Sequence, residues 1–184
     1  MSRPRILLAA LAALVLSVVI AGCQKKAAET PSMSAAPATH TVAEDARLAN
    51  FDDLDFNVFT GQKWDDLKKS HAPNIVVHWP DGHTTTGIDK HIEDLKALFT
   101  WAPDTRITAH PIKLADGEYT AVTGVYEGTF TQPMTLPDGT AIQPTGKAFK
   151  LDMCTVGHWN GDTMDEEYLF WDNQTFMKQV GLAQ

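Results

Sequence analysis

The sequence contains little cysteine and little basic charge. It has 2 Cys among 184 residues, and 15 Lys and Arg face 23 Asp and Glu, which gives a formal net charge of −8. Two cysteines cannot build the disulfide framework of a small secreted domain. An acidic chain also lacks the basic face that sequence-independent nucleic-acid binding requires, so we expect no nucleic-acid partner.

Several site motifs are missing as well. The chain has no Gly-x-Ser-x-Gly elbow and no phosphate-cradling glycine loop, which excludes serine hydrolases and nucleotide hydrolases of those types. Four histidines lie close in the sequence, but their spacings of seven, five and eight residues match no known ligand repeat and no HExxH helix supports them: His71, His78, His83 and His91. We therefore expect neither a metal nor a cofactor.

Long hydrophobic runs are absent except at the N-terminus, where residues 6–20 are uncharged and follow Arg3 and Arg5. This run is shorter than the roughly 20 residues of a membrane span and is typical of a signal-peptide core. The four residues Ile20-Ala21-Gly22-Cys23 resemble the lipobox of bacterial lipoproteins. That resemblance implies a signal peptide over 1–22 and a lipid such as palmitate on Cys23. Gln24 in the next position implies the periplasmic face of the outer membrane.

The remainder divides into a linker and one domain. Residues 23–41 are mostly small or polar and cannot bury enough apolar area to offset the entropy of ordering them, so we expect a flexible linker. Residues 42–184 have the length and composition of a single folded domain with one core.

Helices are expected before strands in this domain. An apolar stripe formed by Leu48, Phe51, Leu54 and Val58 predicts a helix ended by a left-handed Gly61, and further helices are expected over 63–69, from Gly87 to Pro103 and over 173–180. Residues 74–79 predict a strand. Two hairpins are expected, with strands over 106–115 and 118–130, and over 146–159 and 163–171. This order is typical of an α+β fold with helices on one face of a curved sheet.

Several short motifs in the domain resemble those of SnoaL-like polyketide and ester cyclases. The matches run in the family's order from about Phe51 to Gly181. They are Gly87 opening a helix, Ala102-Pro103-Asp104 for the "FPD" signature, Tyr126-Glu127-Gly128-Thr129 for the "GT" strand, Pro144-Thr145-Gly146-Lys147 for "PTGK", and Asp172 followed by Gln179-Val180-Gly181 for the closing aspartate and "QLG" helix.

The resemblance implies the nuclear transport factor 2-like cone, a curved antiparallel sheet wrapped on N-terminal helices around an apolar pocket. It also implies an acid/base aspartate, matching Asp172, that promotes intramolecular aldol closure without metal or cofactor. Pairing through the sheet is common in this fold family, so the resemblance allows a homodimer. The chain departs from the family pattern at Phe130, where a His is frequent, and in the longer segment 131–143.

Asp172 has two open interpretations. It follows a strand whose same-face residues include Glu166, Tyr168 and Phe170, and a carboxylate at an apolar pocket would have a raised pKa and would act as a base near neutral pH. Alternatively, Asp172 caps the final helix by accepting from the next amides, which would lower its pKa.

His78 and His158 are the expected partners of Asp172. The side on which His158 lies depends on the turn at Asn160-Gly161, since a one-residue slip reverses every side chain of a strand. A two-residue turn pairs Trp159 with Asp162 and directs His158 away from Asp172, whereas a three-residue loop pairs Trp159 with Thr163 and places both on one face.

Large side chains suggest a pocket for a small hydrophobic molecule. Those expected to line it are Trp79, Phe99, Tyr126, Phe130, Met153, Tyr168 and Phe170.

Three functions remain open from the sequence. The first is a cofactor-free cyclase or isomerase that uses an aspartate on a small carbonyl substrate. The second is an envelope protein that binds an apolar molecule without turnover, and the third is a protein-interaction module. One fold hosts many functions, so the resemblance alone does not choose among them.

Overall fold

The computed structural model describes residues 39–136 and 139–184, which lie in one compact unit. The expected signal peptide, Cys23 and nearly all of the expected linker lie outside the described residues. No helix in the part of the chain that is described has the length and apolar character needed to cross a membrane.

Helices precede the long strands, as the sequence predicts. α1 (Val42–Asp53) continues into a π-helix, η1 (Leu54–Phe59), which is followed by a 3-10 helix, η2 (Trp64–Lys69). β1 (His71–His78) and β2 (Thr84–Thr86) form a hairpin, and α2 (Ile88–Trp101) follows Gly87. All four residues of the expected apolar stripe in α1 and η1 are buried.

The second half is mostly strand. β3 (Arg106–Ile107), β4 (Lys113–Asp116) and β5 (Tyr119–Thr129) precede the small hairpin of β6 (Met134–Thr135) and β7 (Ala141–Ile142), and β8 (Ala148–Asn160) and β9 (Thr163–Trp171) lead to α3 (Asn173–Gln179). The expected strand over 106–115 is broken into β3 and β4 around Pro111, which has no amide proton to give to a sheet.

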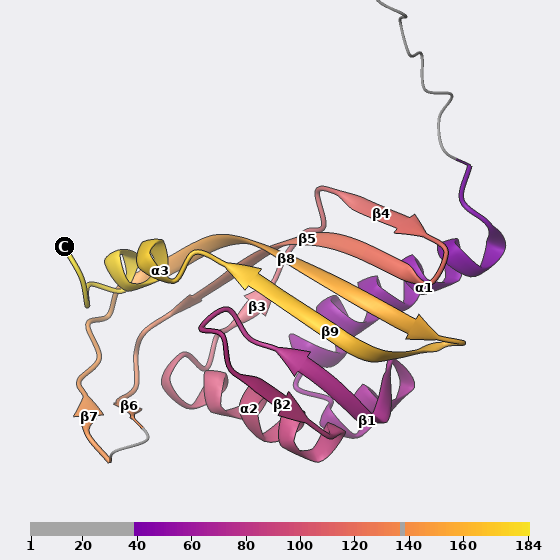
Figure 1. The fold of residues 1–184 in the computed structure, drawn as a ribbon. Helices are drawn as coiled ribbons and strands as arrows, with labels where there is room; N and C mark the ends of the chain where they lie inside the picture. The colour runs from indigo at the N-terminus through magenta and orange to yellow at the C-terminus, as the bar shows by residue number, and fades with distance from the viewer. Residues whose placement is uncertain (1–38, 137–138) are drawn as a thin grey trace, which may run out of the picture. The chain divides into compact units, whose positions relative to one another are not determined.

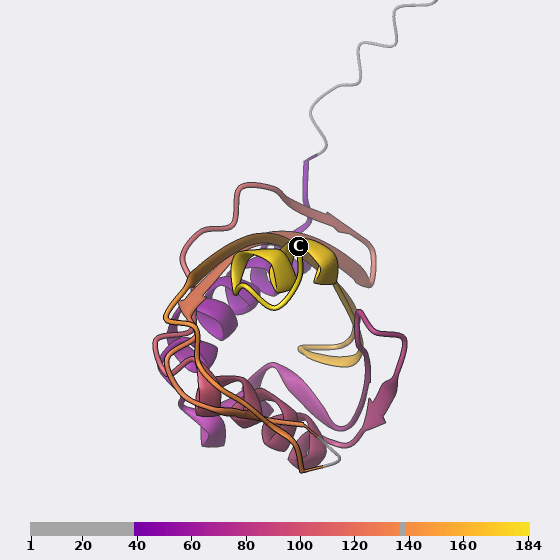
Figure 2. The same ribbon diagram turned by 90° about the vertical axis from the view of Figure 1, so that its left-hand side faces the viewer.

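One strongly curved sheet carries the fold. Its strand order is β2-β1-β9-β8-β5-β3, with β4 also paired to β5, and every pair is antiparallel except β1 with β9. Figure 1 shows α1 and α2 on the concave side of the sheet, and the end-on view of Figure 2 shows sheet and helices closing into a ring. The expected α+β cone is therefore confirmed.

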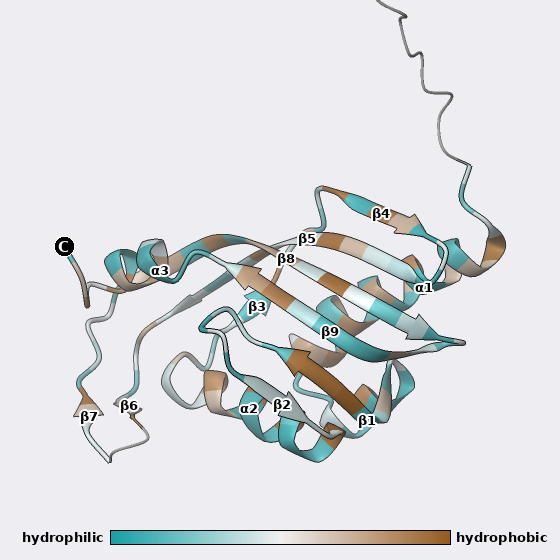
Figure 3. Ribbon diagram, viewed as in Figure 1, coloured by the Kyte–Doolittle hydropathy of each residue, from teal (hydrophilic) through white to brown (hydrophobic). Residues whose placement is uncertain are grey.

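The inner and outer faces of the strands differ in polarity, and Figure 3 shows the alternation along β5, β8 and β9. On β8 the odd-numbered residues from Phe149 to Trp159 face the core. On β9 the buried residues are Met164, Glu167 and Leu169. These inner residues pack against the helices and form the floor of the site described below.

The β8–β9 register differs from both expected turns. Asn160 pairs with Thr163, and the register shifts between His158 and Trp159, so that His158 pairs with Glu166. The extra residue, Asp165, forms a bulge in β9. The result places His158 and Asp172 on the same face, as the three-residue alternative expects, but this face is the outer one.

The end of the π-helix also differs in detail from the expectation. Gly61 is not the left-handed residue, since Gln62 takes that conformation with φ 53°. Gly61 is required for another reason: a Cβ atom there would lie 2.3 Å from the carbonyl oxygen of Asn57.

Candidate functional site

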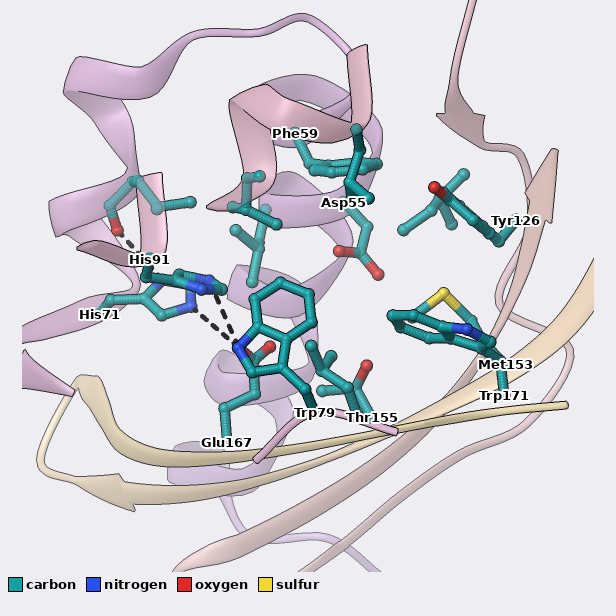
Figure 4. A pocket seen from close by; sticks show the side chains of 16 residues that line it. Asp55, Phe59, His71, Trp79, His91, Tyr126, Met153, Thr155, Glu167 and Trp171 are labelled. Atoms are coloured by element: carbon teal, nitrogen blue, oxygen red, sulfur yellow. Dashed lines mark hydrogen bonds and ion pairs between the residues drawn. The ribbon is translucent and has the colours of Figure 1, made fainter. Parts of the chain in front are cut away.

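A mostly apolar pocket lies between the helices and the concave face of the sheet (Figure 4). Its cavity has a volume of about 50 Å³, which is room for a few water molecules. The lining residues are Leu54, Asp55, Phe59, Leu67, His71, Trp79, His91, Leu95, Leu98, Ile107, Tyr126, Met153, Thr155, Glu167, Leu169 and Trp171. The few polar groups on this apolar wall are the candidates for chemistry.

Asp55 is the carboxylate that η1 presents to the pocket. In this π-helix Leu54 and Asp55 are both buried, as are Val58 and Phe59. The wider π-helical turn therefore directs Asp55 toward the core beside Leu54. Single π-helical turns recur at functional sites for this reason. Figure 4 shows the Asp55 carboxylate directed into the space between Phe59, Tyr126 and Met153.

A chain of hydrogen bonds holds Asp55 from behind. His110 Nε2 lies 2.8 Å from Asp55 Oδ2, and His110 Nδ1 lies 2.7 Å from Asp52 Oδ1. Lys113 Nζ donates to Asp52 Oδ2 at 2.6 Å. The His110 ring is packed against Phe56 and Phe51, with ring centres 4.4 and 6.0 Å away. Asp55 Oδ1 has no hydrogen bond to any residue in the described ranges, which leaves it free to act in the pocket.

The electrostatics of this chain suit proton transfer. Burial raises the pKa of Asp55 above its ordinary value, and the hydrogen bond from His110 opposes only part of that rise. Burial by itself would lower the pKa of His110, but the hydrogen bonds to Asp55 and Asp52 outweigh it and the pKa is raised. A carboxylate with a raised pKa is a stronger base once it has lost its proton.

A second polar group on the pocket wall consists of His71, His91 and Glu167. Glu167 Oε2 lies 3.4 Å from His91 Nε2 and 3.8 Å from His71 Nε2. The three side chains come from β1, α2 and β9, and all are buried. Desolvation lowers the pKa of His91 to about 4. Figure 4 shows the two imidazoles converging on Glu167 behind Trp79.

Asp172 does not line this pocket, contrary to the expectation; it borders a separate open hollow beside Met153 and Phe170. Asp172 is exposed and is the N-cap of α3, where its Oδ1 accepts from the amides of Gln174 and Thr175 at 2.8 and 3.1 Å. The Thr175 hydroxyl also donates to Oδ2 at 2.6 Å. These hydrogen bonds, that from the Thr175 hydroxyl first, lower the pKa of Asp172. The helix-capping alternative is the one that the geometry confirms.

The two predicted partner histidines also lie outside the pocket. His78 Nε2 donates to Glu166 Oε1 at 2.8 Å, and the His78 ring stacks on Tyr168. His158 Nδ1 lies 2.6 Å from Asp165 Oδ1. Glu166 and Tyr168 are on the outer face of the sheet because the bulge at Asp165 sets that phase of β9, and the two histidines pair with that face.

The predicted hydrophobic lining is partly correct in position. Trp79, Tyr126 and Met153 line the pocket. Phe99 and Phe130 are buried in the core away from it, and Tyr168 and Phe170 lie on the outer face, where Phe170 is 52% exposed. The strand phase explains both errors on β9.

Sequence reasoning missed Asp55, His110 and Glu167. Glu167 could have been found from the sequence. It shares one face of the strand with Leu169 and Trp171, and this face is as apolar as the opposite face, which carries Glu166, Tyr168 and Phe170. Asp55 has a weaker signal, a lone acid inside the apolar stripe of a helix. His110 follows no local pattern, since it lies in the irregular segment between β3 and β4.

Solved structures share this architecture. A protein assigned to the SnoaL-like polyketide cyclases from Jannaschia sp. CCS1 superposes with a TM-score of 0.69 at 15% identity, over 80% of this chain and 99% of that one. IdmH of Streptomyces antibioticus, described as a polyketide cyclase, superposes with a TM-score of 0.61 at 19% identity. The match covers 73% of this chain and 98% of IdmH. A protein of Acidithiobacillus ferrooxidans described in the same way superposes with a TM-score of 0.61 at 19% identity. The match covers 80% of this chain and 100% of that protein. At these identities the likeness shows the fold alone.

Comparison with curated protein sequences gives no match. The family model described as SnoaL-like polyketide cyclase matches residues 51–180, which span η1, the pocket and all of α3. This match covers most of the chain, and the cone observed above is the fold that the family implies. The chain therefore belongs to the SnoaL-like polyketide cyclase family.

Proposed function

We propose that this protein is an acid–base catalyst that acts on a small, largely apolar carbonyl compound, as an intramolecular aldol-type cyclase or an isomerase. Asp55 is the proton acceptor. The observation that carries the proposal is a buried carboxylate that faces an apolar pocket with one oxygen free and the other held by His110.

The proposed chemistry needs only Asp55 and the substrate. Asp55 Oδ1 removes a proton from the carbon beside a carbonyl, and the electron pair forms an enolate. In a cyclase the enolate carbon attacks a second carbonyl of the same molecule, so that a C–C bond forms and the attacked C=O becomes an alkoxide. The alkoxide then takes the proton back from Asp55. In an isomerase the proton returns to a different carbon.

His110 and Asp52 act as positioning residues in this proposal. The His110 hydrogen bond fixes the orientation of the Asp55 carboxylate, and Asp52 with Lys113 fixes His110. A side chain held in one orientation loses less entropy when the reacting atoms meet.

The cavity limits the substrate. Its volume of about 50 Å³ is well below the roughly 300 Å³ of a pocket for a drug-sized ligand. A larger substrate would have to displace side chains, and half-buried Trp171, which meets Trp79 edge to face at 6.4 Å, is placed to move.

The Asp55→Asn variant tests the role of this carboxylate. We expect the rate of α-proton exchange of cyclohexanone or acetophenone in D₂O, followed by NMR, to fall by about 10²–10⁴-fold. Asp172→Asn is the matched control and should keep the wild-type rate. An unchanged rate in Asp55→Asn, or an equal loss in Asp172→Asn, would contradict the proposal. Tight binding of a small molecule without any exchange would favour the non-catalytic alternative.

We also propose that the domain is tethered to the bacterial envelope through a lipid on Cys23, as the lipobox-like sequence indicates. Radiolabelled palmitate should label the wild-type protein in bacterial cells and should not label Cys23→Ala. Labelling of both proteins, or of neither, would argue against the anchor.

A further inference from the structure

Three side chains meet in the pocket wall, and each of them has a polar atom without a hydrogen-bond partner among the described residues. His71 Nε2 and Glu167 Oε2 have no hydrogen bond in the described part of the chain, nor does His91 Nδ1. The three side chains are 1%, 5% and 2% exposed respectively, so they are shielded from bulk solvent. Buried polar groups are normally hydrogen-bonded, and an unsatisfied cluster in the wall of a pocket requires an explanation.

Contacts through Nδ1 orient the His71 ring so that Nε2 faces Glu167. His71 Nδ1 lies 3.2 Å from the carbonyl oxygen of Leu67 and 2.8 Å from Ser70 Oγ. A carbonyl oxygen can only accept, so the contact with Leu67 suits a proton on Nδ1. In that tautomer Nε2 presents a lone pair toward Glu167 Oε2, 3.8 Å away, as a metal ligand does.

A simple buried ion pair does not account for this geometry. The 3.4 and 3.8 Å separations between the imidazole nitrogens and Glu167 Oε2 exceed the usual range for an N–H···O hydrogen bond. Charges taken out of water without hydrogen bonds are strongly destabilising. A cation bound by His71 Nε2, His91 Nε2 and Glu167 Oε2 would give His71 Nε2 and Glu167 Oε2 the partner that each lacks.

We propose that His71, His91 and Glu167 bind a divalent transition-metal ion such as Zn²⁺ or Co²⁺. The ligand atoms of the three residues all lie within 4.8 Å of one another. With metal–ligand bonds of about 2.1 Å, neighbouring ligands of a tetrahedral site are about 3.4 Å apart. The His91–Glu167 separation already has this value, and the His71–Glu167 separation is 0.4 Å longer.

The composition of the cluster favours this class of metal. Two imidazoles and one carboxylate suit Zn²⁺ and its first-row neighbours, whereas Ca²⁺ and Mg²⁺ prefer oxygen ligands. The Nδ1–H of His71 bonds to a backbone carbonyl, which is the outer contact that orients metal-binding histidines. All three residues line the pocket, so the open coordination position would face it and would take water or a substrate oxygen.

The sequence alone disfavours a metal because it tests only local spacing. His71 begins β1, His91 lies in the first turn of α2, and Glu167 is in β9, so the cluster exists only in the folded chain. His78 and His83, the other two histidines of that region, lie elsewhere and pair with Glu166 and Asp81.

Metal binding by the full-length chain tests the proposal without any substrate. After treatment with a chelator, the protein is titrated with Co²⁺ and followed through the visible absorption of the bound ion. The matched variants are Glu167→Gln and Glu166→Gln, neighbouring carboxylates on the inner and outer faces of β9. We expect one Co²⁺ for each chain in the wild type and in Glu166→Gln, and binding at least tenfold weaker in Glu167→Gln and His91→Gln.

X-ray absorption of the Zn²⁺-loaded wild type provides a measurement that does not depend on a variant folding. It should show two imidazole ligands and no sulfur. The absence of stoichiometric binding, a sulfur shell, or equal affinity in folded Glu167→Gln and Glu166→Gln would overturn the proposal. The inference goes beyond the proposed acid–base role, and Asp55→Asn separates the two because it should keep the metal while losing proton exchange.

Discussion

At the scale of single residues, environment rather than residue type separates the two aspartates considered for catalysis. Asp172 sits at a helix N-terminus in water, where amide donors stabilise its charge. Asp55 is 9% exposed and lies against apolar side chains, where its charge has lost hydration. The same carboxylate is therefore a weak base in the first position and a stronger base in the second.

The pH dependence of proton exchange should report the raised pKa of Asp55. Asp55 accepts a proton only when it is ionised, so the exchange rate should be lost as the pH falls through its raised pKa, above the ordinary value of about 3.9. Asp52→Asn removes one of the two carboxylates that raise the pKa of His110, and a weaker hydrogen bond from His110 should raise the pKa of Asp55 further.

The acidic limb of the pH–rate profile should thus move to higher pH in Asp52→Asn, with a smaller loss at the plateau than in Asp55→Asn. Asp81→Asn, which removes a carboxylate paired with exposed His83, is the control and should leave the profile unchanged. An unchanged pH–rate profile in Asp52→Asn would contradict the proposed positioning role of His110 and Asp52.

At the scale of secondary-structure elements, η1 and the β9 bulge decide which side chains enter the pocket. The π-helix brings Asp55 inward, and the extra residue Asp165 turns Glu167, Leu169 and Trp171 toward the core. The π-helix has about one residue more in its turn than an α-helix, and the bulge adds one residue to β9. A shift of one residue in a strand exchanges its two faces.

The end of η1 allows a direct test of this local geometry. Gly61→Ala would place a Cβ atom 2.3 Å from the backbone oxygen of Asn57, which the backbone can relieve only by moving. We expect the free energy of unfolding to fall by about 1–3 kcal/mol in urea denaturation.

The adjacent Gln62→Gly variant is the control. Gln62 already has φ 53°, which glycine adopts without strain. The stability should change by less than about 1 kcal/mol, because relief of strain offsets the added freedom of the unfolded chain. Equal destabilisation by both substitutions would show that glycine content, and not the Asn57 contact, matters here.

At the scale of the whole molecule, a single sheet and its helices form one core in which the pocket is a small gap. The largest fully buried side chains come from α1, η2, β1, β5, β8 and β9, among other parts of the unit. All of them lie within residues 38–184, which form one compact unit.

Removal of residues 1–37 should therefore leave the fold intact. We expect a single cooperative thermal transition whose midpoint lies within a few degrees of that of the full-length chain, measured by circular dichroism. Loss of cooperativity, or a much lower midpoint, would mean that the N-terminal residues contribute to the domain.

The sequence by itself determined the order of helices and strands, the α+β cone and the family. These follow from local signals: the apolar stripe of α1 and η1, the turn residues near Gly117 and Gly161, and motifs that lie in a fixed order. Three of the expected lining residues line the pocket: Tyr126 and Met153 follow the regular alternation of β5 and β8, and Trp79 comes directly after β1.

Only the tertiary structure decided which polar residues meet in the pocket. Both faces of β9 carry aromatic residues, so the sequence does not show whether the face with Asp172 or the face with Glu167 points to the core. The bulge at Asp165 fixes the register and directs Glu167 inward. Asp55 with His110, and His71 with His91 and Glu167, join segments far apart in the chain. Such contacts depend on how the sheet curves around the helices, and no periodicity within one segment contains that information.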